Sequence, residues 1–325
     1  MSRIGSNPSF IQTIPITRLL RYPVISANMP SWSKILGEID ASANVQRTLV
    51  LKRQSYLQKI SSLTGRNTIA YYSGWLKYPG APNVLVNETD KNAFMEVVCG
   101  LDRDKGLDLI LHTPGGDLAA TESIVTYLKR MFNNDIRAII PQISMSAGTM
   151  TAMSCKSIVM GEQSSLGPID PQMNGVACQA VLDEFKDAIK QISTNPSSLG
   201  LWQVIISKYR PTDLTACQNA VTWAEKLATA WLSDANPDID VKKVLAVFLN
   251  HRSSFSHAKH MSKQECKDAG LNIVDLEENQ DMQDAVLSLH HCYMIYFDKF
   301  LVSKVVENQQ NGSYIQQFSQ QQQQR

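Results

Sequence analysis

Two adjacent glycines in a tight turn are the first residues of this sequence suited to chemistry. The turn spans residues 112–117, with the sequence HTPGGD, at a point where a strand is predicted to end and a helix to begin. Because Gly115 and Gly116 have no side chains, their backbone N–H groups can approach a carbonyl oxygen and supply half of an oxyanion hole. The alternative interpretation is an ordinary tight turn without a chemical role.

A second turn, residues 144–149 with the sequence SMSAGT, presents a candidate nucleophile. Small neighbours leave Ser146 accessible, and it stands at the start of a predicted helix, where developing negative charge is favoured. The N–H of Ala147 is a candidate second oxyanion donor. The alternative is a serine that only caps the helix. If the two turns follow adjacent parallel strands, Ser146 and Gly115 meet at the carboxyl edge of one sheet.

The elements that position these turns alternate between strands and helices. Short apolar runs predict strands at residues 68–72, 107–111, 136–140, 158–160 and 271–276, and a long helix is predicted from Asp281 to about Val306. Apolar residues at helical spacing lie between the central strands. Such alternation predicts an α/β fold with parallel strands and right-handed crossovers.

The chain divides into three predicted regions. We expect an N-terminal arm over residues 1–65, largely helical from about residue 31. Residues 66–306 are expected to form the α/β domain, which carries a mostly helical insertion at about 176–252. The Gln-rich end, residues 307–325, is predicted to be disordered because it is too polar to pack.

Composition narrows the possible classes of protein. The 325 residues are 43% hydrophobic and 19% charged, which excludes collagen-like, coiled-coil and fully disordered chains. No run approaches the roughly 18 uncharged apolar residues of a membrane span, and the start of the chain lacks a signal-peptide pattern, so a cytoplasmic location is expected. The net charge of +1 argues against nucleic-acid binding by bulk electrostatics. Six scattered cysteines without a C-x-x-C motif indicate neither a disulfide framework nor a cysteine zinc site.

A polar loop at residues 164–172, with the sequence SSLGPIDPQ, follows the strand after the Ser146 helix. The order and spacing of these three motifs resemble those of the Clp-fold serine peptidases. Among them, the sequence resembles the serine dehydrogenase proteinase (SDH) family, which is similar to signal peptide peptidase A and the Clp proteolytic subunit. The resemblance runs from about Thr68 to Gln172 and returns weakly from Ser256 to Asp275.

This resemblance implies a ClpP/crotonase-type spiral of ββα units and assembly into homo-oligomers. It also implies that Ser146 is the nucleophile and that Gly115 and Ala147 are oxyanion donors. Clp proteolytic subunits carry a catalytic histidine in the loop that here reads Gly167-Pro168-Ile169-Asp170, and this loop has none. The resemblance therefore does not identify the general base.

Three possibilities remain open for that base: two hypotheses name a residue, and the third is that the chain has no competent base. In the first, His257 deprotonates Ser146 and Asp170 orients its imidazole, as in a serine, histidine and aspartate triad. The second follows the Ser-Lys dyad of signal peptide peptidase relatives, with Lys186 or Lys190 as a desolvated amine. Both lysines lie in a predicted amphipathic helix, where a solvated polar face is the alternative.

The other histidines give weaker signals. His257 and His260, with His290 and His291, have some potential as zinc ligands, but adjacent histidines on one helix point in different directions, so no metal site is expected. His112 fits a buried residue at a strand end better than a catalyst.

The leading functional hypothesis is a serine endopeptidase that binds an extended peptide or unfolded protein, forms an acyl-enzyme on Ser146 and needs no cofactor. One alternative is a crotonase-type acyl-CoA enzyme, which shares the fold and oxyanion hole but uses carboxylates, and no paired glutamate stands in the two turns. The other is a non-catalytic oligomeric scaffold, favoured by the absent Clp histidine. The insertion would form either a lid or an oligomer contact.

Overall fold

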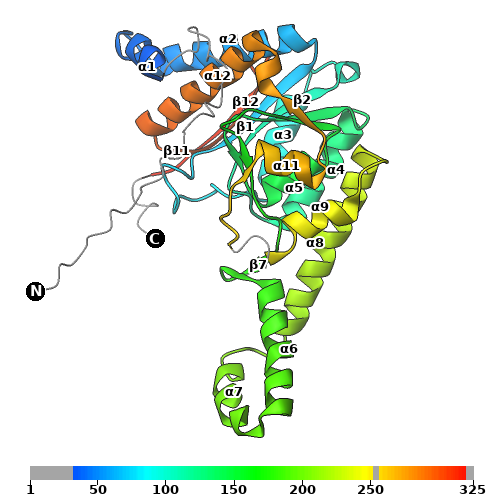
Figure 1. The fold of residues 1–325 in the computed structure, drawn as a ribbon. Helices are drawn as coiled ribbons and strands as arrows, with labels where there is room; N and C mark the ends of the chain where they lie inside the picture. Colours follow the sequence, from blue (N-terminus) through cyan, green and yellow to red (C-terminus); the bar gives the residue numbers. More distant parts are fainter. Residues whose placement is uncertain (1–31, 252–255, 320–325) are drawn as a thin grey trace, which may run out of the picture.

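A seven-stranded sheet forms the centre of the molecule in a computed structural model that describes residues 32–251 and 256–319 (Figure 1). The strand order is β10-β5-β3-β2-β1-β11-β12. The strands are β1 (Asn67–Ser73), β2 (Leu107–His112), β3 (Ile136–Ile140), β5 (Ser157–Met160), β10 (Ile273–Asp275), β11 (Val302–Asn308) and β12 (Ser313–Gln317).

Strands β10, β5, β3, β2 and β1 pair in parallel, whereas β11 and β12 add an antiparallel edge. A mostly parallel α/β sheet is what the sequence predicts. Every residue of β1 and β2, and every residue of β3 except Arg137, is buried, as expected for strands covered by helices on both faces of a sheet.

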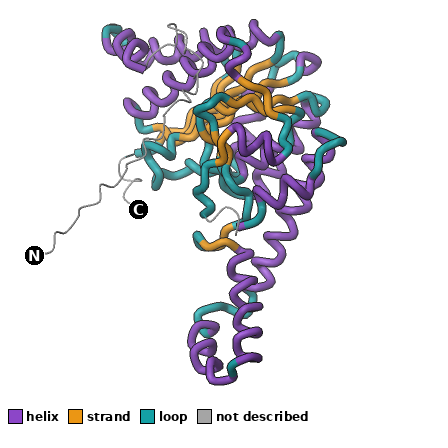
Figure 2. Tube along the Cα trace, in the orientation of Figure 1, coloured by secondary structure: helices purple, strands orange, loops and turns teal. Residues whose placement is uncertain are grey.

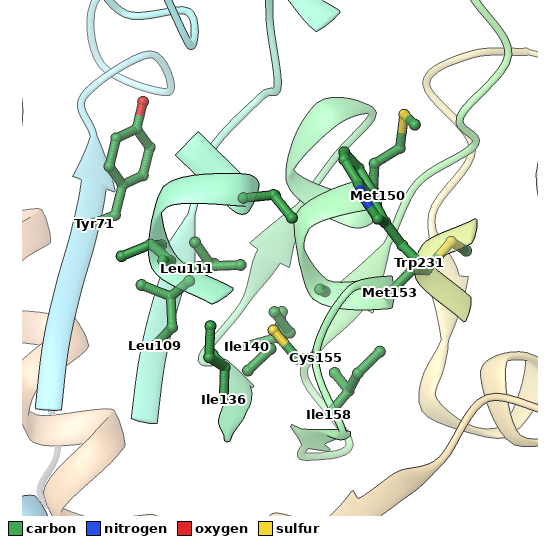
Figure 3. Packing of buried hydrophobic residues seen from close by; sticks show 14 of the residues in the cluster. Tyr71, Leu109, Leu111, Ile136, Ile140, Met150, Met153, Cys155, Ile158 and Trp231 are labelled. Carbon is green, nitrogen blue, oxygen red and sulfur yellow. The ribbon is translucent and has the colours of Figure 1, made fainter. Parts of the chain in front are cut away.

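Helices cover both faces of this sheet, which Figure 2 shows as a layer of strands between two layers of helices. Alternate residues of one strand enter different cores: Leu109 and Leu111 belong to one buried cluster and Ile110 to the other. The first cluster, part of which is seen in Figure 3, contains α3 (Asp90–Val98), α4 (Leu118–Met131) and α5 (Ala147–Met153). The second contains α1 (Trp32–Asp40), α2 (Val45–Thr64) and α12 (Gln280–Lys299).

The helical part of the expected N-terminal arm is packed into this second layer. Leu49, Leu57 and Ile60 of α2 are fully buried, and the Arg53 guanidinium forms a buried ion pair with Glu307 of β11. Residues 32–65 are therefore part of the α/β body; residues 1–31 lie outside the described residues.

Short strands continue beyond the carboxyl ends of the main sheet. A small sheet contains β4 (Ile143–Ser144), β6 (Ser165–Leu166) and β9 (Met261–Ser262), and α11 (Lys263–Ala269) follows it. An isolated bridge pairs Thr113, just after β2, with Ser144 of β4. This bridge brings the two predicted turns next to each other.

The predicted insertion has two different halves. It contains β8 (Val176–Ala177), which pairs with β7 (Gln172–Met173) just before it, and α6 (Cys178–Thr194), α7 (Leu199–Ile206), α8 (Asp213–Ala235) and α9 (Val241–Phe248). Helix α9 and the end of α8 pack on the main core through Trp231, Leu232 and Phe248. Helices α6 and α7 project away from the sheet (Figure 1). The described part of the chain also contains the short 3-10 helices η1 (Arg103–Lys105), η2 (Pro196–Ser198) and η3 (Leu276–Glu278).

The C-terminal region corrects two expectations. The long helix ends at Lys299 rather than near Val306, and β11 occupies most of the remaining residues expected to be helical. Strand β12, which lies in the region expected to be disordered, pairs with β11 as an antiparallel hairpin. The β-branched residues of β11 favour a strand, and Asn311, with φ of 70°, precedes Gly312 in the turn, a strong hairpin signal. Residues 320–325 lie outside the described residues.

Candidate active site

Ser146 occupies a sharp turn between β4 and α5. Its φ of 50° and ψ of −116° lie in a region that residues with side chains rarely adopt, which costs on the order of 1–3 kcal/mol. The following Gly148 is required by close packing, because a methyl group there would lie 2.4 Å from both Ser144 Oγ and Thr113 Cγ2. Among the described residues, no group forms a hydrogen bond with Ser146 Oγ. The strained turn therefore presents a half-buried hydroxyl without a partner.

Gly115 lies directly against this serine. A methyl group on Gly115 would be 2.7 Å from Ser146 Cβ and 2.8 Å from the backbone nitrogen of Ala147, and the φ of Gly115 is 90°. Two backbone hydrogen bonds hold the turns together, one from Met145 N–H to Thr113 O at 2.9 Å and one from Thr113 N–H to Ile143 O at 3.3 Å. Only glycine fits this contact.

The hydrogen bonds of the glycine turn assign different roles to its two N–H groups. Gly115 N–H donates to Thr113 Oγ1 at 3.1 Å, so it is already occupied. Gly115 C=O accepts from Val86 N–H at 2.9 Å, and in a trans peptide the N–H of Gly116 points the opposite way, away from Val86. Within residues 32–251 and 256–319, neither Gly116 N–H nor Ala147 N–H has an acceptor.

These contacts change the expected donor pair. Gly116 N–H and Ala147 N–H are the available donors, whereas Gly115 contributes the space in which they can approach an oxyanion. Thr113 and Val86 were not recognised from the sequence as site residues. Thr113 could have been identified from its hydroxyl, which lies two positions before Gly115. Val86 contributes only backbone atoms, so its side chain gives no such signal.

Asp170 and His257, which are 87 residues apart in sequence, form a close pair. Their Oδ1 and Nδ1 atoms are 2.7 Å apart, with side-chain exposures of 3% for Asp170 and 29% for His257. Asp170 Oδ2 also accepts from Gln172 Nε2 at 2.7 Å, and the backbone of the loop is tied by a bond from Ile169 N–H to Phe248 O. Because a carboxylate only accepts, His257 carries its proton on Nδ1, which leaves Nε2 free to take a proton.

The pair borders a cleft of about 780 Å³. Pro114 and Met145, from the two turns, contribute to the same walls, together with the apolar side chains of Trp75 and Ile143. Ser146 itself does not line this cleft, and no hydrogen bond joins it to His257 in the described part of the chain. The structure thus brings His257 and Asp170 together and places them in the cleft bordered by the residue before Ser146.

The candidate lysines lie elsewhere. The side chain of Lys186, on α6, is 72% exposed and forms an ion pair with Asp183 at 3.6 Å. Lys190 is exposed on the same helix, and neither lysine lines the cleft. Neither side chain has the desolvated environment that a lysine base requires.

His112 and His290 form a buried cluster with Tyr72 and Trp75 at the end of β2. The ring centroids of His112 and His290 are 5.1 Å apart, and neither ring nitrogen of His112 has a hydrogen-bond partner among the residues that the structure describes. Burial, aided by the neighbouring histidine, holds the pKa of His112 well below its usual value. Burial also lowers the pKa of His290 to about 3. Both histidines are therefore neutral in the folded protein near neutral pH.

The fold and the strained serine define the class of protein: a mostly parallel α/β protein with a glycine turn beside a serine at a helix start. The family of ClpP-like SDH-type serine proteinases matches residues 36–200, and the chain belongs to this family. The family resemblance expected from the three motifs is confirmed.

Two relatives from Methanocaldococcus jannaschii are similar to this chain. The uncharacterized protein MJ0137 is 38% identical over 84 residues, which cover 26% of this chain and 29% of that protein. The uncharacterized protein MJ1495 is 24% identical over 232 residues, 70% of this chain and 74% of that protein. In the described residues, no helix has both the length and the apolar character needed to cross a membrane.

Proposed function

We propose that this protein is a serine endopeptidase that hydrolyses peptide bonds through an acyl-enzyme on Ser146. The observation that carries the proposal is the strained backbone of Ser146, with φ of 50°, held against Gly115. Membership of a serine proteinase family supports the same activity. Strain of this kind persists where surrounding contacts hold it, and it is concentrated at active sites.

Ser146 Oγ attacks the substrate carbonyl carbon while His257 Nε2 accepts the hydroxyl proton. The resulting oxyanion receives hydrogen bonds from the N–H groups of Gly116 and Ala147, which have no acceptor among the described residues. Such donors contribute about 10²–10³ in rate per donor in known cases. Asp170 holds the His257 ring through the 2.7 Å contact and stabilises the imidazolium that forms.

The tetrahedral intermediate then collapses. The carbon–nitrogen bond breaks, the proton on His257 Nε2 passes to the leaving amine, and the acyl group stays on Ser146. A water molecule, deprotonated by His257, attacks the ester, and the serine recovers its proton as the acid product leaves. Every step uses groups of this chain, water and the peptide.

His257 must approach Ser146 before this chemistry begins. No hydrogen bond joins them in the described residues, and catalytic contacts are often longer before substrate binds. His257 lines the cleft together with Met145, the residue that precedes Ser146. We infer that an extended peptide seated in this cleft, against the apolar walls of Trp75 and Ile143, completes the contact.

Labelling with a fluorophosphonate probe tests this function. Such a probe esterifies an activated serine, so the wild-type chain should be labelled and the Ser146→Ala variant should not. Ser197→Ala, at an exposed serine of the insertion, is a matched control and should be labelled like the wild type. Label retained by Ser146→Ala, or absent from the wild type, would exclude the proposed nucleophile.

A non-catalytic scaffold is the second candidate, because no hydrogen bond joins Ser146 to His257 within the described residues. Digestion of casein separates the two candidates. An endopeptidase cleaves it in a Ser146-dependent way, whereas a scaffold leaves it intact at all concentrations of the chain.

We further propose a Clp/crotonase-type spiral and a homo-oligomer. Two successive crossovers support the spiral, because β3 leads into β4 and β5 leads into β6, each adding one strand to the main sheet and one to the small sheet. Exposed apolar side chains on the projecting helix α7, Leu201 at 64% and Val204 at 62%, support self-association. Light scattering after size-exclusion chromatography measures the assembly.

A further inference from the structure

A buried ion pair lies on the far side of the segment that holds the glycine turn. Lys304 of β11 and Asp90 at the start of α3 are both fully buried, with Lys304 Nζ at 2.6 Å and 2.8 Å from the two carboxylate oxygens. Tyr71 OH donates to the same carboxylate at 2.8 Å. Neither charged residue borders the cleft. The chemistry described above does not use them.

Each side chain of this ion pair forms a hydrogen bond with one of the two peptide units that flank Val86. Lys304 Nζ donates to Leu85 C=O at 2.9 Å, and Asp90 Oδ2 accepts from Asn87 N–H at 3.0 Å. Leu85 C=O shares a peptide unit with Val86 N–H, and Asn87 N–H shares one with Val86 C=O. Because the two groups of a trans peptide point in opposite directions, the ion pair directs both groups of Val86 outward.

The outward groups of Val86 bind the glycine turn. Val86 N–H donates to Gly115 C=O at 2.9 Å, and Val86 C=O accepts from Asp117 N–H at 2.9 Å. Space between the segments is minimal, since a methyl group on Gly116 would lie 2.3 Å from Val86 O and 2.4 Å from Val86 N. The orientation of the Gly115–Gly116 peptide, and with it the direction of Gly116 N–H, is therefore set by Val86.

We propose that Lys304 and Asp90 are positioning residues that aim the Gly116 oxyanion donor through the peptide units on either side of Val86. Two hydrogen bonds, from Lys304 Nζ to Leu85 C=O and from Val86 N–H to Gly115 C=O, alternate with the Leu85–Val86 and Gly115–Gly116 peptide units and so connect Lys304 to Gly116 N–H. The catalytic consequence rests on the proposed peptidase function, whereas the effect on the turn does not.

The same strand supplies a matched control. Arg53 and Glu307 form an equally buried ion pair, with Glu307 on β11 three residues after Lys304, and Arg53 lies on α2 over the other face of the sheet. Lys304→Met and Arg53→Met each leave a buried carboxylate unpaired, so both should destabilise the fold. Only Lys304→Met removes a hydrogen bond to the Val86 segment.

Hydrogen–deuterium exchange on the full chain tests the positioning role without any need for activity. The amides of Val86 and Asp117 should exchange at least about tenfold faster in Lys304→Met than in Arg53→Met. The two variants are compared under conditions in which their free energies of unfolding are equal. Equal exchange in the two variants would overturn the proposal. Tyr71→Phe, which removes one bond to Asp90 and keeps the ion pair, should give a smaller acceleration in the same two amides. If Lys304→Met does not fold, this variant decides, and unchanged exchange in it overturns the proposal.

Rates of peptide cleavage and of fluorophosphonate labelling then measure the catalytic consequence. A displaced oxyanion donor should lower kcat and the labelling rate by about 10- to 100-fold and leave KM within about threefold, because the bond is made mainly in the transition state. Arg53→Met should keep the wild-type kcat below its unfolding temperature. A change in KM alone, or an equal decrease of kcat in Lys304→Met and Arg53→Met, would count against the positioning role. A wild-type chain that neither cleaves nor labels refutes the peptidase function, while the exchange measurement still decides the role of Lys304.

Discussion

Acidification should destabilise this protein well above the range in which carboxylates titrate, because two buried histidines must stay neutral. His112 is fully buried and its pKa lies well below the usual value, and burial lowers the pKa of His290 to about 3. In the unfolded chain both titrate near pH 6.5. Below that pH the unfolded state therefore binds more protons than the folded state, and the free energy of unfolding decreases.

The size of the effect follows from the pH interval alone as long as the folded protein keeps both rings neutral. Each histidine contributes about 1.4 kcal/mol per pH unit, so lowering the pH from about 6.5 to about 5 costs about 2 kcal/mol per histidine and about 4 kcal/mol for the two. The stabilising contribution is complete above about pH 6.5 and is lost as the pH falls toward the folded pKa values.

Urea unfolding at about pH 7 and about pH 5 measures this loss, with His290→Gln as the perturbation and the exposed His260→Gln as the control. His290→Gln should halve the difference between the two pH values, to about 2 kcal/mol, whatever its effect on stability at neutral pH. The difference should decrease more in His290→Gln than in His260→Gln, because only the first substitution removes a buried ring. A variant at His290 with the full wild-type difference would refute the assignment of the acid sensitivity to this cluster.

Three further predictions concern the site and the assembly. Asp170→Asn should lower kcat by about 10⁴-fold in a peptide cleavage assay, because the His257 ring would lose its carboxylate partner and its proton position, and a loss below tenfold would contradict that role. Gly115→Ala should abolish labelling of Ser146, since the new methyl would lie 2.7 Å from its Cβ and at a φ of 90°, whereas normal labelling would show that the contact can relax. Leu201→Glu combined with Val204→Glu should reduce the oligomer size seen by light scattering at unchanged helix content, and an unchanged assembly would exclude α7 from the contact.

Local sequence patterns predict the parts of this fold that depend on local physics. The strands at 107–111 and 136–140 are mostly apolar runs, each with one charged residue, and the structure places them between two helical layers. The turns around Gly115 and Ser146 can be predicted from the sequence, because small residues are needed wherever backbones approach closely. The sequence also allows a hypothesis for Asp170 and His257, whose contact depends on a fold that brings together residues 87 positions apart.

Other features depend on geometry that no pattern of residue types records. The separate roles of the Gly115 and Gly116 amides follow from the direction of one peptide unit, which is set by Val86. Val86 contributes only backbone atoms to that contact, so its identity carries no signal. At the C-terminus the sequence pattern predicts a helix over most of β11, so the turn signal at Asn311 and Gly312 has no preceding strand to join. The high glutamine content then predicts disorder where the structure has β12.

The strain at Ser146 is offset by contacts that also connect it to the Asp170 loop. Thr149 Oγ1 donates to Ser144 C=O at 2.8 Å, just before the strained residue, and accepts from Gly167 N–H at 3.0 Å, at the start of the loop that leads to Asp170. Gly148 N–H donates to Met145 C=O at 2.8 Å and closes the turn on its other side. One buried hydroxyl therefore fixes the spacing between the Ser146 turn and the start of the Asp170 loop.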